Sequence, residues 1–197
     1  MLPVRGQWEL SDVIGLFTSG GGWSMDGDPS AWYEITDYLN QGLIEVAEER
    51  YEPVPEPTDA LLAPYFEAAK RDSGRSKHHW LKWSAWNWLN SLGDETPVYE
   101  YSCCYGKADL ALPRGRIFVE CGNTRADKFV VMVQRFRKCA MVRYPYPEKT
   151  KGVSEYWRII LRPTSKLWYL IRKQRLAFDA GIAEKIRTRD VSWLRAR

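Results

Sequence analysis

The pattern of apolar and polar positions predicts a mixed α/β (α+β) chain. Segments with apolar residues three and four positions apart alternate with short β-branched and aromatic runs, which favour strands. We expect helices over 8–17, 28–40, 57–70, 77–92, 128–140, 165–180 and 182–197, and strands over 97–104, 105–112, 117–122 and 157–163.

The first third of the chain predicts two helices followed by a β-hairpin. The hairpin strands are expected at 43–46 and 51–54. The segment 37–46, with its Leu-x-x-Gly-Leu-Ile pattern, resembles the end of a recognition helix and the wing of a winged-helix domain. The polar stretch 71–76 indicates a domain boundary. We therefore expect a small N-terminal domain, 1–73, and a second domain, 74–197.

The centre of the chain carries the chemistry that stands out. Segments 105–112 and 117–122 are two apolar strands joined by a Pro-Arg-Gly-Arg turn, and each holds one carboxylate, Asp109 and Glu120. Burying an unpaired carboxylate is costly. Two that face each other across a hairpin indicate a site for a divalent metal ion.

The order helix, three-strand meander, helix over residues 76–140 resembles the core of the PD-(D/E)xK nuclease superfamily, the restriction-endonuclease-like fold. There, an Asp ends the second strand and an acid-x-Lys motif lies in the third. Asp109 matches the Asp, and Glu120 matches the acid of the second motif. The resemblance implies phosphodiester hydrolysis with Mg²⁺ or Mn²⁺, whose charge stabilises the phosphate and lowers the pKa of the attacking water. It also implies that the backbone carbonyl of Cys121 is a further metal ligand, with Glu100 as an additional carboxylate.

The sequence departs from that family at the lysine, because Gly122 stands in its position. Lys128 or Arg125 could reach the site from the next helix, and Lys107 precedes Asp109 by two residues on its strand. Alternatively, no lysine acts in catalysis, and the fold is a binding module that does not cleave. A purely structural role, with both carboxylates ion-paired to nearby cations, also stays open; the cations weighed are Lys107, Arg116 and Arg125.

The helix 77–92 is apolar nearly all round, which predicts a core helix rather than an aromatic platform for stacking bases. His78 and His79 lie in its first turn, where we expect a solvated helix end.

Charge is distributed unevenly along the chain. Residues 1–60 hold 2 basic and 12 acidic side chains, whereas residues 135–197 hold 17 basic and 5 acidic ones. Basic residues interleaved with tryptophan and tyrosine favour contacts with nucleic-acid phosphates. The residues expected to contact DNA are Arg125, Arg135, Lys138, Lys166, Arg172, Lys173 and Arg175.

The remaining features narrow the class of protein. There is no run of 18 apolar residues and no signal-peptide pattern, so we expect no membrane partner and a cytoplasmic protein. The four cysteines show no zinc-site spacing and are expected to be reduced thiols.

These observations lead to one main hypothesis and two alternatives. The main hypothesis is a metal-dependent DNA endonuclease or nickase. Its domain order and the segment 120–124 are similar to plasmid replication–relaxation proteins, which are relaxases of the MobC type. One alternative is a non-catalytic DNA-binding regulator of a plasmid or phage. The other is a protein-interaction module, whose acidic N-terminal region contacts a partner protein or a second copy.

Overall fold

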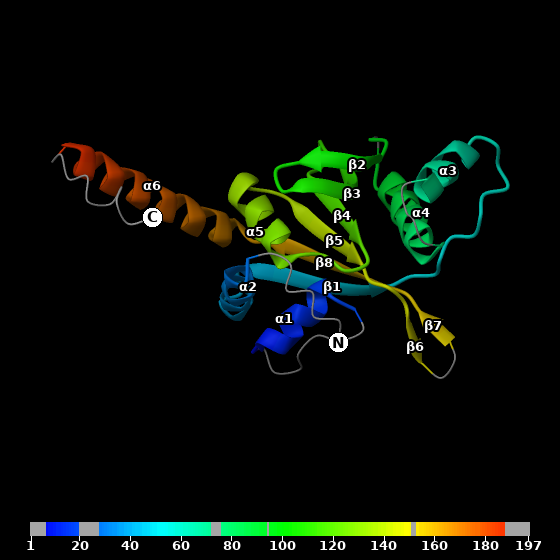
Figure 1. Ribbon diagram of the computed structural model, residues 1–197, viewed down its shortest axis with the longest axis horizontal. Coiled ribbons are helices and arrows are strands. Elements are labelled where there is room, and N and C mark those ends of the chain that lie inside the picture. The colour runs from blue at the N-terminus through cyan, green and yellow to red at the C-terminus, as the bar shows by residue number, and fades with distance from the viewer. Residues whose placement is uncertain (1–6, 20–27, 72–75, 94, 151–152, 188–197) are drawn as a thin grey trace.

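The computed structural model describes residues 7–19, 28–71, 76–93, 95–150 and 153–187. Within them, six helices accompany a mixed six-stranded sheet and a two-stranded sheet (Figure 1). The helices are α1 (Leu10–Phe17), α2 (Ser30–Asn40), α3 (Ala63–Arg71), α4 (Ser76–Ser91), α5 (Ala126–Arg135) and α6 (Ser165–Arg187). The strands are β1 (Ile44–Arg50), β2 (Val98–Cys103), β3 (Gly106–Leu112), β4 (Ile117–Cys121), β5 (Ala140–Tyr144), β6 (Glu148–Thr150), β7 (Val153–Glu155) and β8 (Trp157–Pro163).

The large sheet has the strand order β1-β8-β5-β4-β3-β2. Strands β2, β3 and β4 form an antiparallel meander, and α5 then carries the chain to β5, which pairs parallel to β4. Strand β8 pairs antiparallel with β5 on one side and with β1 on the other. The predicted helix, meander and helix are therefore present as α4, β2–β4 and α5.

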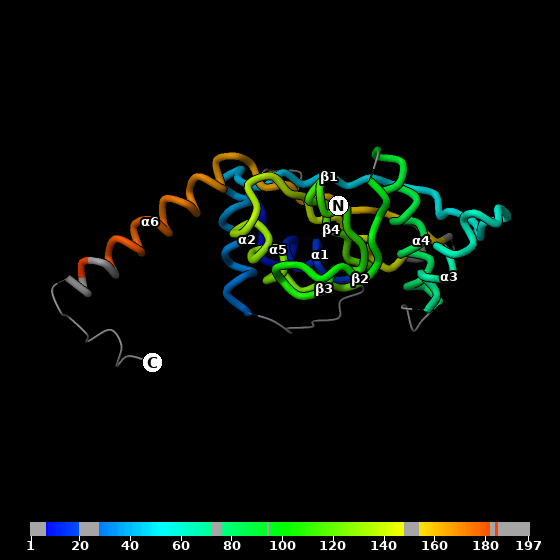
Figure 2. Tube along the Cα trace, turned by 90° about the horizontal axis from the view of Figure 1, so that it is seen from above, coloured from blue at the N-terminus to red at the C-terminus, as the bar shows by residue number. Residues whose placement is uncertain are grey.

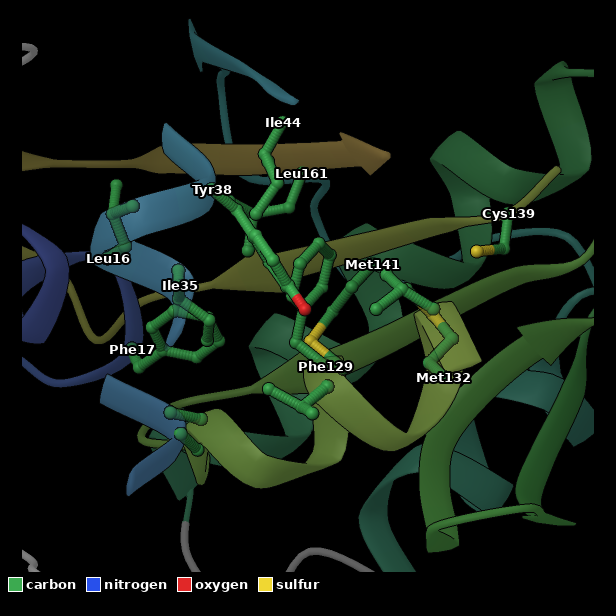
Figure 3. Close-up of a cluster of buried hydrophobic side chains, with 14 of the residues drawn as sticks. Leu16, Phe17, Ile35, Tyr38, Ile44, Phe129, Met132, Cys139, Met141 and Leu161 are labelled. Atoms are coloured by element: carbon green, nitrogen blue, oxygen red, sulfur yellow. The ribbon is translucent and has the colours of Figure 1, made fainter. Parts of the chain in front are cut away.

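Helices cover both faces of this sheet, because its central strands alternate apolar side chains between two clusters. Phe118, Met141 and Leu161 pack with α1, α2 and α5 on one face, where side chains from all of these elements converge (Figure 3). Val119 and Val142 pack with α3 and α4 on the other face. The tryptophan-rich α4 is a core helix, as its sequence predicts.

Strand β5 replaces part of a predicted helix. The sequence predicts a helix to residue 140, but α5 ends at Arg135 and residues 140–144 form a strand that is buried along its whole length. A short strand buried on both faces lacks the alternation that distinguishes strands from helices, which explains the error.

The predicted hairpin over 43–54 is also wrong. Strand β1 pairs with β8, more than a hundred residues later, and residues 51–58 form no strand. Pro53, Pro55 and Pro57 lack the backbone N–H that a second strand needs.

The expected domain boundary lies at residues 72–75, outside the described residues. Segments from both sides of it share the large sheet and the α1–α2–α5 cluster. The division at residue 73 stays a prediction.

The C-terminal segment departs from the expected pair of helices. Helix α6 is continuous from Ser165 to Arg187, and the last ten residues of the predicted second helix lie outside the described part. After its first turns, α6 projects away from the sheet and the other helices (Figures 1 and 2). No described helix combines the length and apolar character that crossing a membrane requires.

Candidate metal and phosphodiester site

The meander is distorted at Asp109, and this distortion creates the site. The ladder between β3 and β4 runs from Leu112↔Ile117 to Leu110↔Val119. At the next position a side-chain contact replaces the pairing of the two strands: Asp109 Oδ2 accepts a hydrogen bond from the backbone N–H of Cys121 at 2.7 Å. Ala108 and Leu110, although two residues apart, pack in opposite clusters. The strand therefore loses its regular alternation at Asp109.

Helix α4 supplies a lysine and a histidine to Asp109. Lys82 Nζ lies 3.4 Å from Asp109 Oδ1, and His78 Nε2 lies 3.4 Å from the same oxygen. The Lys82 side chain is completely buried. Burial alone would raise the pKa of Asp109, but the His78 and Cys121 hydrogen bonds and the Lys82 charge outweigh it, so that pKa lies below its usual value. Asp109 is thus ionised and held in place.

Glu100, on β2, completes this cluster. Its Oε1 accepts a hydrogen bond from Lys82, and its backbone has a positive φ of 49°. Burial lowers the pKa of Lys82, whereas the Glu100 hydrogen bond and the Asp109 and Glu100 charges raise it, and the net shift is upward. Lys107 lies on the exposed side, 4.0 Å from Glu100 Oε2. Glu100 therefore stabilises the charge of Lys82 rather than leaving it uncompensated.

Glu120 lies on β4 and contacts α5 instead of α4. Its Oε2 accepts a hydrogen bond from Lys128 Nζ at 2.7 Å and one from the Thr124 hydroxyl at 3.3 Å. Lys128 also donates to the carbonyl oxygen of Lys107 at 3.3 Å, which ties α5 to the start of β3. Of the three cations considered as substitutes for the lysine at position 122, Lys128 is thus the one that contacts Glu120, whereas Lys107 lies near Glu100 and Arg125 pairs with Asp127.

The other oxygen of Glu120 is unusual. Oε1 is buried, and although it makes no hydrogen bond of ideal geometry among the described residues, the Tyr105 hydroxyl interacts with this carboxyl group. Burial raises the pKa of Glu120 to about 7, the Lys128 charge opposes this shift, and the Asp109 charge adds to it. The two carboxylates are therefore electrostatically coupled across the β3–β4 pair.

The donor set fits Mg²⁺ better than zinc. Among the described residues, no three His, Cys, Asp or Glu side chains converge as a ready-made metal cage. Mg²⁺ commonly binds through one or two carboxylates, with water and substrate phosphate as its other ligands. The two carboxylates on β3 and β4 contact different helices, Asp109 facing α4 and Glu120 facing α5. The Cys121 thiol is buried in the α4 cluster and burial raises its pKa well above normal, so only its carbonyl is a candidate ligand.

Gly122 adopts a conformation that suits glycine. Its φ is +82°, and its N–H donates to the carbonyl oxygen of Tyr144 at 2.7 Å. The buried Arg143 donates from Nε to the Gly122 carbonyl at 2.8 Å and from Nη1 to the Gly15 carbonyl at 2.9 Å. The backbone just beyond Glu120 is thereby anchored to α1.

The residues expected to contact DNA lie near the two ends of α5 and along α6. Arg125 lies beside the site at the start of α5, where it forms an ion pair with Asp127. Arg135 and Lys138 are exposed at the far end of α5. The other four, Lys166, Arg172, Lys173 and Arg175, are exposed along α6.

Sequence reasoning missed the residues that α4 contributes. His78 was expected in a solvated helix end, but its side chain is 17% exposed and contacts Asp109. His79 is buried and packs edge-on against Phe66. Lys82 carried a readable signal, because a lysine in the middle of a helix that is apolar nearly all round must find an acidic partner.

Both carboxylates are paired with lysines, as the structural alternative supposes, but with Lys82 and Lys128. Of the cations considered from sequence for that role, Lys107 lies near Glu100, Arg116 lies over the Phe136 ring and Arg125 pairs with Asp127.

No protein-family model, no curated protein and no solved structure matches this chain at a significant level.

Proposed function

We propose that the chain is a metal-dependent DNA endonuclease or nickase with a PD-(D/E)xK-like core. The observation that carries this proposal is the pair of carboxylates on adjacent strands, of which Glu120 is buried between Lys128 and the Tyr105 hydroxyl and has a raised pKa. The order α4, β2–β4, α5 and the location of Asp109 and Glu120 on the second and third strands support it.

In the proposed reaction, Asp109, Glu120 and the Cys121 carbonyl hold Mg²⁺ or Mn²⁺. The ion, when bound, lowers the pKa of a water and offsets charge on the scissile phosphate. Lys82 and His78 keep Asp109 ionised and oriented. Lys128 orients Glu120 and favours its charged form at neutral pH. Arg125 and the exposed cations of α6 contact the DNA backbone.

The direct test measures cleavage of supercoiled, linear and single-stranded DNA with Mg²⁺ or Mn²⁺. We expect Asp109→Ala and Glu120→Ala each to reduce cleavage by about 100-fold or more, because each removes a ligand of the catalytic ion. Glu67→Ala, an exposed acid on α3, is the matched control and should cleave like the wild type. Wild-type protein that cleaves none of the three DNAs with either ion would overturn the proposal.

One observation favours a second candidate, a DNA-binding protein that does not cleave. Gly122 stands where the related nucleases have a lysine, and its conformation disfavours other residues. If this candidate holds, Asp109→Ala and Glu120→Ala should leave DNA affinity unchanged, and wild-type protein should bind DNA without cutting it.

A further inference from the structure

The space next to Gly122 is filled by another residue. A Cβ atom added to Gly122 would lie 2.7 Å from two ring carbons of Tyr146 and 2.8 Å from its hydroxyl oxygen. These distances are shorter than van der Waals contact. The Tyr146 ring and hydroxyl therefore occupy the start of the path that a side chain at position 122 would take, including the lysine of an acid-x-Lys motif.

The backbone around Tyr146 holds this ring in place. Tyr146 lies between Pro145 and Pro147, which restrict the chain to extended conformations on both sides. It follows directly on β5, whose last residue, Tyr144, bonds the Gly122 N–H. The ring thus reaches Gly122 from the neighbouring parallel strand rather than from a distant loop.

The Tyr146 ring also faces the α4 side of the candidate site. Its centroid lies 6.4 Å from that of His78, whose Nε2 is 3.4 Å from Asp109. Tyr146 is thus placed between the backbone just after Glu120 and the side chain that contacts Asp109. It brings a hydroxyl, which can donate and accept a hydrogen bond, to a site whose usual lysine is missing.

We propose that Tyr146 is a catalytic residue of this site and that its hydroxyl orients the attacking water in place of the absent lysine. This inference rests on the proposed function. In the hydrolysis, the water oxygen bonds to phosphorus as the bond to the leaving oxygen breaks. The water gives up one proton to solvent, and the leaving oxygen takes one from solvent, so the products are a phosphate monoester and a free hydroxyl.

A purely space-filling role for Tyr146 makes a different prediction, and Tyr146→Phe separates the two. Phenylalanine keeps the ring beside Gly122 and removes only the hydroxyl. We expect Tyr146→Phe to lower kcat about 10- to 100-fold, with KM, the melting temperature and Mn²⁺ affinity unchanged. A kcat equal to that of the wild type would overturn the proposal.

Removing the whole Tyr146 side chain is a second test of its role. Tyr146→Ala alone should lower kcat at least as far as Tyr146→Phe. A lysine at position 122 would be strained with or without the ring, because the φ of Gly122 is +82°. Gly122→Lys should therefore not restore activity to Tyr146→Ala. A Tyr146→Ala variant that folds, binds Mn²⁺ and keeps the wild-type kcat would contradict the proposal.

A measurement that does not depend on cleavage locates Tyr146 relative to the metal. With 3-fluorotyrosine at position 146, Mn²⁺ should broaden the ¹⁹F resonance strongly. The same label at Tyr169, exposed on α6, should stay sharp at equal Mn²⁺. Mn²⁺ binding without broadening at 146 would overturn this inference alone. A wild-type protein that neither binds Mn²⁺ nor cleaves DNA would overturn the proposed function and this inference with it.

Discussion

At the scale of single residues, the chain treats its two central carboxylates differently. Asp109 has Lys82, His78 and a backbone N–H around it, and its pKa is lowered. Glu120 is more deeply buried, has Lys128 and Thr124 on one oxygen only, and its pKa is raised. Asp109 is therefore ionised at neutral pH, with both oxygens engaged by protein groups, whereas Glu120 changes its protonation near neutral pH.

The raised pKa of Glu120 predicts a pH-dependent stability. The folded protein holds the Glu120 proton up to about pH 7, whereas the unfolded chain releases it near the ordinary value of 4.5. The stability that this proton contributes is present below pH 4.5 and is lost as the pH rises to about 7. The loss is about 3 kcal/mol in the free energy of unfolding.

Glu120→Gln should remove this dependence, because the amide does not titrate. The measurement is urea unfolding at pH 5 and pH 7.5 with a chelator present. Between pH 5 and pH 7.5, the free energy of unfolding should fall by about 2 kcal/mol more in the wild type than in the variant. Glu67→Gln is the exposed control and should follow the wild type. Equal pH dependence in wild type and Glu120→Gln would contradict the assignment.

At the scale of elements, α6 differs from the other helices. Leu167 is buried and Leu170 and Ile171 pack against the α1–α2–α5 cluster, but every described side chain from Arg172 to Gly181 is exposed. The distal part of α6 therefore adds little to the stability of the sheet, and its basic residues are available for contacts with another molecule.

We expect the triple variant Arg172→Glu, Lys173→Glu and Arg175→Glu to bind DNA more weakly. In a plot of the logarithm of affinity against the logarithm of salt concentration, the slope of the variant should be smaller than that of the wild type by about 2 to 3, because three phosphate contacts are lost. The melting temperature should hardly change, since these side chains are exposed.

Lys70→Glu with Arg71→Glu, on the distant α3, changes the net charge by as much as Arg172→Glu with Lys173→Glu and is the control for that α6 double variant. If this control weakens DNA binding as much as the α6 variant does, net charge alone explains the effect and α6 is not the contact surface.

At the scale of the whole molecule, the N-terminal segment is built into the sheet. Strand β1 pairs with β8 along its full length, and α1 and α2 bury Val13, Phe17 and Ile35 completely against the central strands. Each such side chain contributes about 1.5–3 kcal/mol on burial. That sum is a large part of the roughly 5–15 kcal/mol by which a typical domain is stable.

The predicted boundary at residue 73 can be tested with fragments. We expect fragment 74–197 to lack a cooperative unfolding transition, because it loses β1 and one wall of the α1–α2–α5 cluster. A chain that ends at Lys173 should unfold cooperatively like the full protein, because it loses only exposed parts of α6 among the described residues. A cooperative transition in fragment 74–197 would show that the C-terminal segment folds as an independent domain.

The local elements and the two acidic positions could be predicted from the order of the amino acids alone. Helical spacing located α4 and most of α5, and alternation located the meander, because both signals come from neighbours a few residues apart. Asp109 and Glu120 could be predicted in the same way, because each is a single acid among the apolar residues of its strand. The basic character of the C-terminal third was also readable directly from composition.

Only the tertiary structure decided which side chains meet. Lys82 contacts Asp109 because α4 lies across β3 with that face inward, and no local pattern sets this rotation. Strand β1 joins β8, and Tyr146 reaches Gly122, through contacts between segments that are distant along the chain. Side-chain periodicity reports burial and exposure, whereas pairing between distant segments depends on how the whole chain packs. For this reason the two carboxylates and Lys128 could be predicted, whereas the contacts of His78, Lys82 and Tyr146 could not.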